Sequence, residues 1–274
     1  MPKREIDLNR CLFQYASGNC RRCEEICPQQ AVKNREFDAA RCDDCGLCTA
    51  VCPAGAIQSG VDYDTCLTQA QELEPQVLLC KKVRENSMHC LGALNRRLLW
   101  ALAEKQPLAI DTSRCTACNP AVAKWLDKEI AACNETLAAE GKPAIRLVHV
   151  REIKKAPAQQ VGRRSFFQSL FHATARGVAD FAESQTTRLY AFDPVIWLER
   201  QGLAASGGIF PSLTAADSCN ACGLCAMLCP ENAIAIKTDA AGSKTLSFTP
   251  LRCTGCQLCT GSCPHGALAL QLPV

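Results

Sequence analysis

The stretch that decides the fold is CDDCGLCTAVCP, residues 42–53. Its cysteines follow the spacing C-x2-C-x2-C-x3-C-P, and the same spacing returns at residues 219–230 and 253–264. A further copy keeps the C-x2-C-x3-C-P end at residues 20–28, while its first cysteine is displaced to Cys11. Each copy continues past its proline with an alanine and an aliphatic residue at fixed offsets, as in CPAGAI and CPENAI. The sequence therefore predicts one structural unit that has been duplicated, arranged as two pairs.

Cysteine is the main outlier of the composition. The chain has 22 cysteines in 274 residues, and it is far too long to be a small disulfide-stapled scaffold. Cysteine thiolates are the soft, anionic ligands that the irons of an iron-sulfur cluster need. Zinc also binds cysteine pairs spaced by two residues, but a zinc site needs only one set of four ligands. It does not account for a third C-x2 step followed by C-x3-C-P.

Charge and hydropathy exclude two other classes of protein. The formal net charge of +3 is small and no basic stripe is interleaved with aromatic residues, so no nucleic acid partner is expected. No stretch approaches the roughly 18 uncharged apolar residues of a transmembrane helix, so no direct membrane span is expected. Residues 1–10 are mostly polar and lack the apolar segment of a signal peptide, which makes a cytoplasmic location the expectation.

The two cysteine-rich ends resemble the bacterial 2x(4Fe-4S) ferredoxin family, over residues 5–62 and 209–272. The resemblance implies that each end folds as two short helices and small antiparallel hairpins around two clusters, related by a pseudo-two-fold axis. It also implies that the chain carries single electrons at low potential, as a polyferredoxin would. The C-x8-C opening at Cys11 is the one departure from the family pattern.

In this family the cysteine before the proline ligates the other cluster of its pair, which implies four ligand sets. We call them sites one to four. Site one consists of Cys11, Cys20, Cys23 and Cys52, and site two of Cys42, Cys45, Cys48 and Cys27. Site three consists of Cys219, Cys222, Cys225 and Cys263, and site four of Cys253, Cys256, Cys259 and Cys229. The expected cofactors are therefore four 4Fe-4S clusters.

The region between the two ends has a different pattern. Residues 76–80, 108–111 and 144–150 read as short buried strands, whereas residues 91–105 and 121–140 carry helical periodicity. Consecutive parallel strands need a crossover element between them, and helices occupy those positions here. The order therefore favours a small parallel sheet with covering helices.

Four of the remaining cysteines form a candidate middle site. Cys80 ends the first expected strand, Cys90 opens the first helix, and Cys115 and Cys118 follow the second strand in the expected loop SRCTACNP. Ligands collect at the carboxyl ends of strands in an open α/β sheet, so these four are expected to bind one metal centre. The arrangement resembles thioredoxin-fold 2Fe-2S ferredoxins and the small iron-sulfur subunits of some hydrogenases, although the closing pair is C-x2-C rather than C-x3-C.

The chemistry of the middle site stays open at this point. A fifth iron-sulfur cluster, a structural zinc, a redox-active thiol pair and simple buried cysteines all fit a C-x2-C pair. The last two cysteines, Cys66 and Cys133, are expected to be packing residues, because free cysteine is often buried.

The expected fold class is α+β, with two ferredoxin-like dicluster domains flanking a small α/β parallel-sheet domain. The dicluster domains are expected at residues 1–62 and 209–274, the α/β domain with its four-cysteine site at residues 63–155, and a helical connector at residues 156–208. Within the connector, GRRSFF at residues 162–167 is expected to begin a helix whose phenylalanines dock against a neighbouring domain or partner.

No dinucleotide loop, P-loop, flavin fingerprint or acid-base pair accompanies the cysteines. The expected role is therefore a non-catalytic electron-transfer subunit of an oxidoreductase. It would carry single low-potential electrons between a redox enzyme subunit and a second electron carrier. The alternative is an oxidoreductase whose middle domain reduces a thiol or small molecule at Cys115 and Cys118, using electrons from the ferredoxin domains.

The iron content tests the number of clusters. Protein purified without oxygen should contain about sixteen iron and about sixteen sulfide from the four expected cubanes, and more only if the middle site also holds iron. Colorimetric iron and sulfide analysis measures both. Saturation near about eight iron would contradict four clusters.

Overall fold

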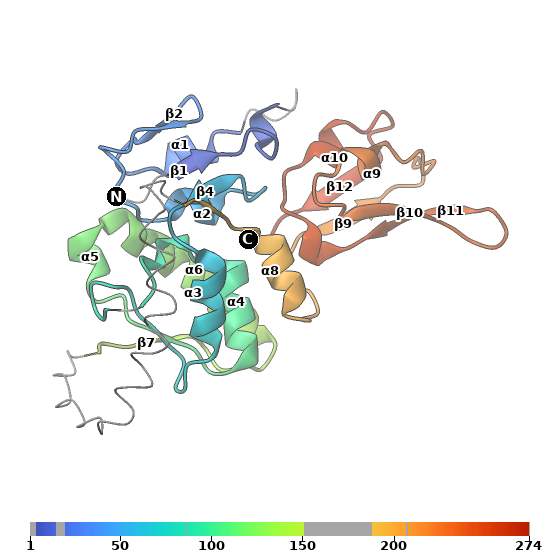
Figure 1. Cartoon of the computed structure of the whole chain (residues 1–274). Coiled ribbons are helices and arrows are strands. Elements are labelled where there is room, and N and C mark those ends of the chain that lie inside the picture. The colour runs from blue at the N-terminus through green and yellow to red at the C-terminus, as the bar shows by residue number, and fades with distance from the viewer. Residues whose placement is uncertain (1–3, 15–19, 86, 151–187, 207, 274) are drawn as a thin grey trace, which may run out of the picture.

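The computed structural model describes residues 4–14, 20–85, 87–150, 188–206 and 208–273. Short helices and small sheets alternate through the described part of the chain, so the fold is of the expected α+β type (Figure 1). The helix expected to begin at residues 162–167 lies outside the described residues.

The N-terminal cysteine-rich end contains two short helices and two antiparallel strand pairs. Its elements are β1 (Arg4–Ile6), η1 (Leu12–Gln14), α1 (Arg22–Ile26), β2 (Val32–Lys33), β3 (Glu36–Phe37), α2 (Leu47–Val51) and β4 (Ile57–Ser59). β1 pairs with β4, and β2 pairs with β3. Helices α1 and α2 each stop at a cysteine that precedes a proline, Cys27 and Cys52, where the backbone turns extended. Proline disfavours the helical conformation in the residue before it, so the sequence itself ends both helices there.

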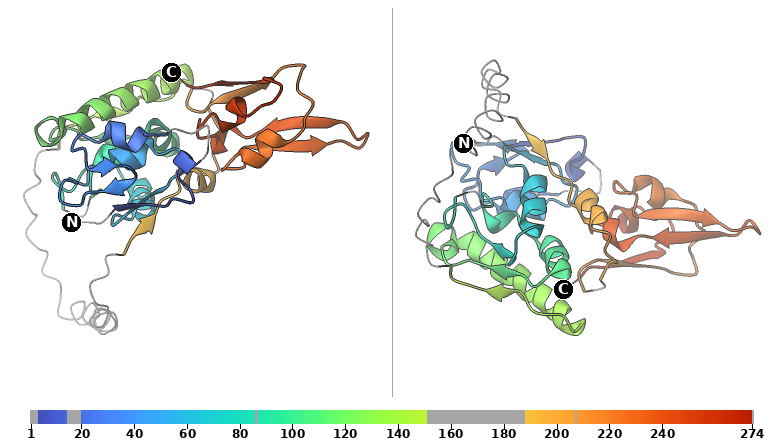
Figure 2. Two further views of the ribbon diagram at one scale, coloured as in Figure 1. Left: turned by 90° about the horizontal axis from the view of Figure 1, so that it is seen from above. Right: turned by 60° about the horizontal axis from the view of Figure 1, so that its bottom comes forward.

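The C-terminal end repeats this plan. Its elements are β9 (Ser212–Ala215), α9 (Leu224–Leu228), β10 (Ile234–Thr238), β11 (Lys244–Phe248), η3 (Pro250–Arg252), α10 (Leu258–Gly261) and β12 (Leu268–Gln271). The outer strands β9 and β12 pair antiparallel, and the inner strands β10 and β11 form a hairpin that is longer than its N-terminal counterpart. Figure 2 shows this hairpin projecting away from the rest of the molecule. Both ends thus have the helices and hairpins that the ferredoxin resemblance implies.

The middle region contains the parallel sheet that the alternation of strands and helices predicts. Its elements are α3 (Tyr63–Gln71), β5 (Val77–Leu78), η2 (Leu91–Ala93), α4 (Arg96–Lys105), β6 (Ala109–Ile110), α5 (Cys115–Cys118), α6 (Pro120–Ala139) and β7 (Arg146–Leu147). β6 is the central strand and pairs parallel with both β5 and β7. The three strands are shorter than expected, at two residues each.

One local expectation is wrong: Cys115 and Cys118 lie on helix α5 and not in a loop. The cause is the start of α6 directly after α5. The Asn119 side chain accepts the N–H groups of Ala121 and Val122, and Pro120 occupies the first helical position, so α6 begins there without a linker. The short segment between β6 and α6 therefore forms a single helical turn. A hydrogen bond from the Asn119 N–H to the Cys115 carbonyl closes this turn.

The segment that follows residue 187 packs against both the N-terminal end and the middle region. Strand β8 (Tyr190–Ala191) adds to the free side of β4, and helix α8 (Pro194–Arg200) follows it. Trp197 of α8 is fully buried, and the Phe210 ring meets the Trp100 ring edge to face, with centroids 5.4 Å apart. These aromatic side chains belong to one core that runs through the middle region and reaches both ends.

That core also contains the two cysteines assigned to packing. Cys133 is fully buried in it, and Cys66 packs against its edge, as the sequence predicts. Burial raises the pKa of both thiols, so neither is an activated nucleophile.

Gly92 of η2 tests how closely the middle region approaches the N-terminal end. A Cβ at this position would overlap the backbone oxygen of Cys45 and lie 3.0 Å from Val122 Cγ2. Gly92→Ala should therefore destabilise the folded chain by about 2 kcal/mol through overpacking, measured as a lower thermal midpoint. The matched control is Gly261→Ala in α10, because a Cβ there meets nothing within 4 Å. Equal losses in the two variants would contradict a close contact at Gly92.

Candidate iron-sulfur sites

Three small cavities are each lined by the four cysteines that the resemblance assigns to one site. The first contains the four cysteines of site one, Cys11, Cys20, Cys23 and Cys52. The second contains those of site three, Cys219, Cys222, Cys225 and Cys263. The third contains those of site four, Cys229, Cys253, Cys256 and Cys259. In each cavity the cysteine before the proline comes from the other repeat of the pair.

The cysteines of site two are also near one another. Burial raises the pKa of the Cys48 thiol to about 11. The charge of Arg4 lowers this pKa, whereas the negative charges of the Cys42 and Cys27 thiolates raise it. The fourth member, Cys45, lies at the edge of the set and lines the neighbouring middle cavity as well. Site two is thus the N-terminal site that faces the middle region.

Backbone N–H groups point at the sulfur atoms of the cysteines that precede proline. In three copies the alanine four residues later donates its N–H to the cysteine sulfur at 3.2 Å: Ala31 to Cys27, Ala56 to Cys52, and Ala233 to Cys229. In the fourth copy the Ala267 N–H is the main group that lowers the pKa of the Cys263 thiol. This contact gives the repeated C-P-x-x-A string its physical meaning, since an N–H group aimed at a thiolate stabilises its negative charge.

The residue before each of these alanines makes the contact possible. It has a left-handed backbone in all four copies: Gln30 (φ 49°), Gly55 (φ 56°), Asn232 (φ 50°) and Gly266 (φ 56°). Glycine and asparagine tolerate this conformation, whereas glutamine adopts it less readily. The turn bends the chain back so that the alanine N–H faces the sulfur.

Charge and burial at these sites fit a resident iron-sulfur cluster. Burial raises the pKa of the Cys23 thiol to about 12, and the next largest causes are the Cys52 and Cys48 thiolates. Without metal such thiols keep their protons, and binding of a metal centre displaces them. Four soft ligands around one small cavity, with N–H donors to the sulfurs, match the chemistry of a 4Fe-4S cluster.

Arg4 is a site residue that the sequence analysis missed. It is buried, and its guanidinium donates to Asp44 Oδ1 (2.8 Å from Nε), Thr49 Oγ1 (3.0 Å) and Tyr63 Oη (2.9 Å). It also reaches the sulfur of Cys48 at 3.9 Å. A fixed positive charge therefore lies against site two. The only signal in the sequence is the alternation in β1, where Arg4 faces inward and the next residue outward.

The four cysteines of the middle site come together in one cavity of about 220 Å³. It is lined by Cys80, Cys90, Cys115 and Cys118, with Asp43, Cys45, Lys81, Lys82, His89, Arg114, Asn119 and Val122 around them. Burial raises the pKa of the Cys115 thiol to about 12, with the Cys80 and Cys90 thiolates as the next causes. Lys82 Nζ lies 2.8 Å from the sulfur of the exposed Cys118. No three Cys, His, Asp or Glu side chains in the described part of the chain are placed to hold a single metal ion.

Comparison with known proteins identifies the chemistry of both ends. Residues 218–267 match the 4Fe-4S dicluster domain, and residues 17–63 match the LdpA Fe-S cluster-binding domain. The chain carries iron-sulfur domains. These are metal-binding domains of the 4Fe-4S kind, which serves in electron transport.

One curated relative extends the comparison. It is a subunit of the ion-translocating oxidoreductase complex of Methanosarcina acetivorans, and it is 42% identical over 43 residues. The match covers 14% of this chain and 16% of that protein. No helix among the described residues is long and apolar enough to cross a membrane.

The crossed arrangement of cysteines is testable at Cys52. Cys52→Ser should damage the cluster otherwise held by Cys11, Cys20 and Cys23, because Cys52 lines their cavity. EPR spectra of the reduced protein, compared with a Cys45→Ser variant of site two, measure which cluster is lost. Loss of the same cluster in both variants would contradict the crossing.

Proposed function

We propose that this chain is an electron relay whose centres follow one another in a fixed order: middle site, site two, site one, site four, site three. A bound 4Fe-4S cluster takes up and returns a single electron. The order of transfer then depends on which ligand loops are neighbours. Contacts between the ligand loops therefore determine the order, and the exposed sites determine where electrons enter and leave.

The carrying observation is the contact between the two ferredoxin ends. Leu12, Ala54 and Leu258 form a small buried cluster, and Cys20 and Cys256 pack against it. Cys20 belongs to the ligand set of site one, and Cys256 to that of site four. Three apolar side chains therefore lie between ligand loops from opposite ends of the chain. This supports electron transfer between site one and site four.

A second contact joins the middle site to site two. Cys45 lines the middle cavity, and Asn119 Nδ2 donates to Asp43 Oδ2 at 2.6 Å. The close approach of Gly92 to the Cys45 backbone holds the same loops together. The middle site thus extends the relay beyond site two, at one end, and does not bridge the two ferredoxin pairs.

The exposed cysteines belong to the first and last sites of the proposed order. Of the 22 cysteines, Cys118 and Cys222 are exposed, and the others are buried or half-buried. Cys118 belongs to the middle site and Cys222 to site three, the two ends of the proposed order. Electrons can therefore enter and leave at the ends, while the surrounding protein shields the centres between them.

The surfaces at the two ends suit different partners. Lys81 and Lys82 are exposed beside the middle site, and such a basic surface attracts an acidic electron carrier. Near site three the Met227 side chain is 84% exposed on helix α9, which follows Cys222. A flexible methionine adapts its shape to a partner surface. We propose that the second electron carrier binds at the basic surface, and that the redox enzyme subunit binds at the surface around Met227.

The ion pairs of Arg10 provide the test of the central contact. Arg10 Nη2 lies 2.6 Å from Asp193 Oδ2 and 3.7 Å from Glu231 Oε1, so it joins the N-terminal end, the start of α8 and the C-terminal end. Burial raises the pKa of Glu231, and the charge of Asp193 raises it further, whereas Arg10 lowers it. Removing the guanidinium leaves two carboxylates facing each other.

Arg10→Gln should therefore loosen the contact between site one and site four by about 1 kcal/mol and slow electron transfer between the two ends. Flash reduction followed by EPR measures the rate, and the spin-spin interaction of the two reduced centres reports their separation. Arg200→Gln, which removes the exposed pair with Asp64, is the matched control. Identical rates and spin coupling in all three proteins would contradict the order, and steady conversion of a thiol by the isolated chain would favour the enzyme alternative.

A further inference from the structure

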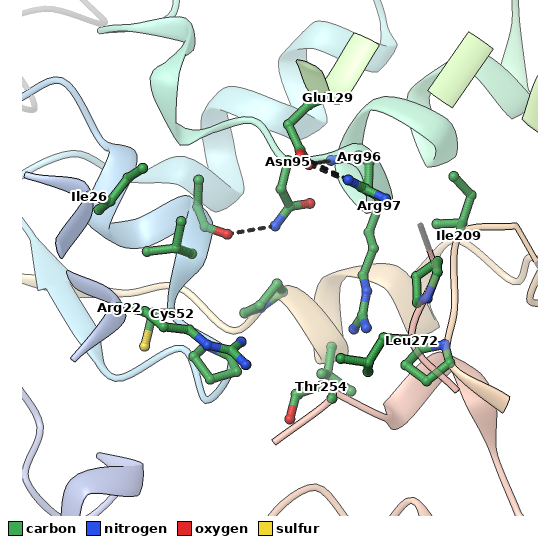
Figure 3. Close-up of a pocket in the computed structure, with 18 of the residues that line it drawn as sticks. Arg22, Ile26, Cys52, Asn95, Arg96, Arg97, Glu129, Ile209, Thr254 and Leu272 are labelled. Atoms are coloured by element: carbon green, nitrogen blue, oxygen red, sulfur yellow. Dashed lines mark hydrogen bonds and ion pairs between the residues drawn. The ribbon is translucent and has the colours of Figure 1, made fainter. Parts of the chain in front are cut away.

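A large cavity lies where the N-terminal end, the middle region and the C-terminal end meet. Its volume is about 450 Å³, which is within the range of small-molecule sites. Aliphatic side chains form much of the wall, among them Val51, Val195, Leu198, Ile209 and Leu272. The cavity adjoins site one, whose own cavity shares Arg22, Cys52 and Pro53 with it (Figure 3). The rest of its wall belongs to none of the cysteine sites.

Two arginines from different parts of the chain face this cavity. Arg97 extends from the start of α4 towards Thr254 and Leu272, and Arg22, the first residue of α1, points into the same space from the wall near Cys52 (Figure 3). The Arg97 guanidinium stacks over the Phe210 ring at 5.2 Å. Within the described residues neither arginine has a carboxylate as a hydrogen-bond or ion-pair partner.

The charges around Arg97 are of both signs. Burial lowers its pKa to about 10, the Cys253 thiolate opposes this, and the charges of Arg96 and Arg22 lower the pKa further. Arg97 is half-buried, and a partly desolvated guanidinium is stabilised by negative charge beside it. Among the described residues no carboxylate bonds to it, so the geometry favours an anion between the arginines.

The neighbouring polar groups do not supply that anion. Glu129 accepts hydrogen bonds from the backbone and side chain of Arg96, and Asn95 Nδ2 donates to the Ala50 carbonyl at 3.1 Å. Glu25 lines the cavity but is exposed to solvent. Among the residues that the structure describes, the guanidinium groups of Arg22 and Arg97 therefore face the cavity without a carboxylate partner.

We propose that this junction cavity binds a small organic molecule carrying phosphate or carboxylate groups, held by Arg22 and Arg97. Planar guanidinium groups bind both oxyanions through paired N–H donors. The aliphatic wall accommodates the carbon skeleton of the ligand, and a volume of about 450 Å³ suits a small organic molecule.

The cavity lies beside sites one and four, so a bound ligand would affect electron transfer between them. Cys52 belongs to site one, and Thr254 lies between Cys253 and Cys256 of site four. A bound anion adds negative charge beside both ligand loops and disfavours an extra electron there. This consequence rests on the proposed function, whereas the binding itself does not depend on it.

The test is calorimetric titration of the full chain, purified without oxygen and with its iron content measured, at low ionic strength. The probes are pyrophosphate and citrate, which separate the phosphate from the carboxylate arm, with glycerol as the uncharged control. One probe should bind at a single saturable site. Arg97→Gln and Arg22→Gln should each weaken that binding by roughly tenfold or more. Arg146→Gln, an exposed arginine of β7 outside the cavity, should leave it unchanged.

Two results would overturn the site. One is the absence of heat from both anions at millimolar concentration. The other is binding that survives in both arginine variants. Because Arg22 is exposed, its variant reports on binding even if Arg97→Gln fails to fold. A low iron content would contradict the proposed relay but not the anion site. A lower reduction potential in Arg97→Gln, without any anion binding, would mean that Arg97 only balances the charge of site four.

Discussion

The N–H group that alanine donates to a cysteine sulfur four residues earlier is the interaction on which both ends of the molecule depend. It closes the turn after each helix, and the proline inside that turn stops the helix at the cysteine. The sulfur is then directed away from its own repeat and towards the other one. Because both repeats of a pair have this geometry, each half contributes one cysteine to the cavity of the other. Neither repeat lines such a cavity with four cysteines of its own.

Much of this arrangement could be predicted because it is encoded locally. Cysteine spacing and the following proline determine a turn within ten residues, so the repeats, their helices and the pairs are readable from the chain. The three strands of the middle region are readable for a similar reason, since each is a short apolar run between helices. The chemistry of the middle cavity could not be predicted in this way, because it depends on the shape of the cavity and on charges from distant residues such as Asp43.

The features that could not be predicted depend on distant partners. Arg4 is buried because Asp44, Thr49 and Tyr63 accept its hydrogen bonds, and these residues lie 40 or more positions away. Strand β8 has only two residues, and pairing with β4 gives it its conformation. The contact between the two cysteine-rich ends depends on three scattered apolar residues in loops and short helices, which no periodicity marks.

The uneven exposure of the cysteines has a consequence for life in air. Oxidation of cysteine to sulfenic acid follows exposure and thiolate character, so damage begins where sulfur meets solvent. Here those positions are Cys118 and Cys222. Oxygen would therefore damage the middle site and site three first, and the buried thiols, such as Cys48 and Cys259, would be oxidised later.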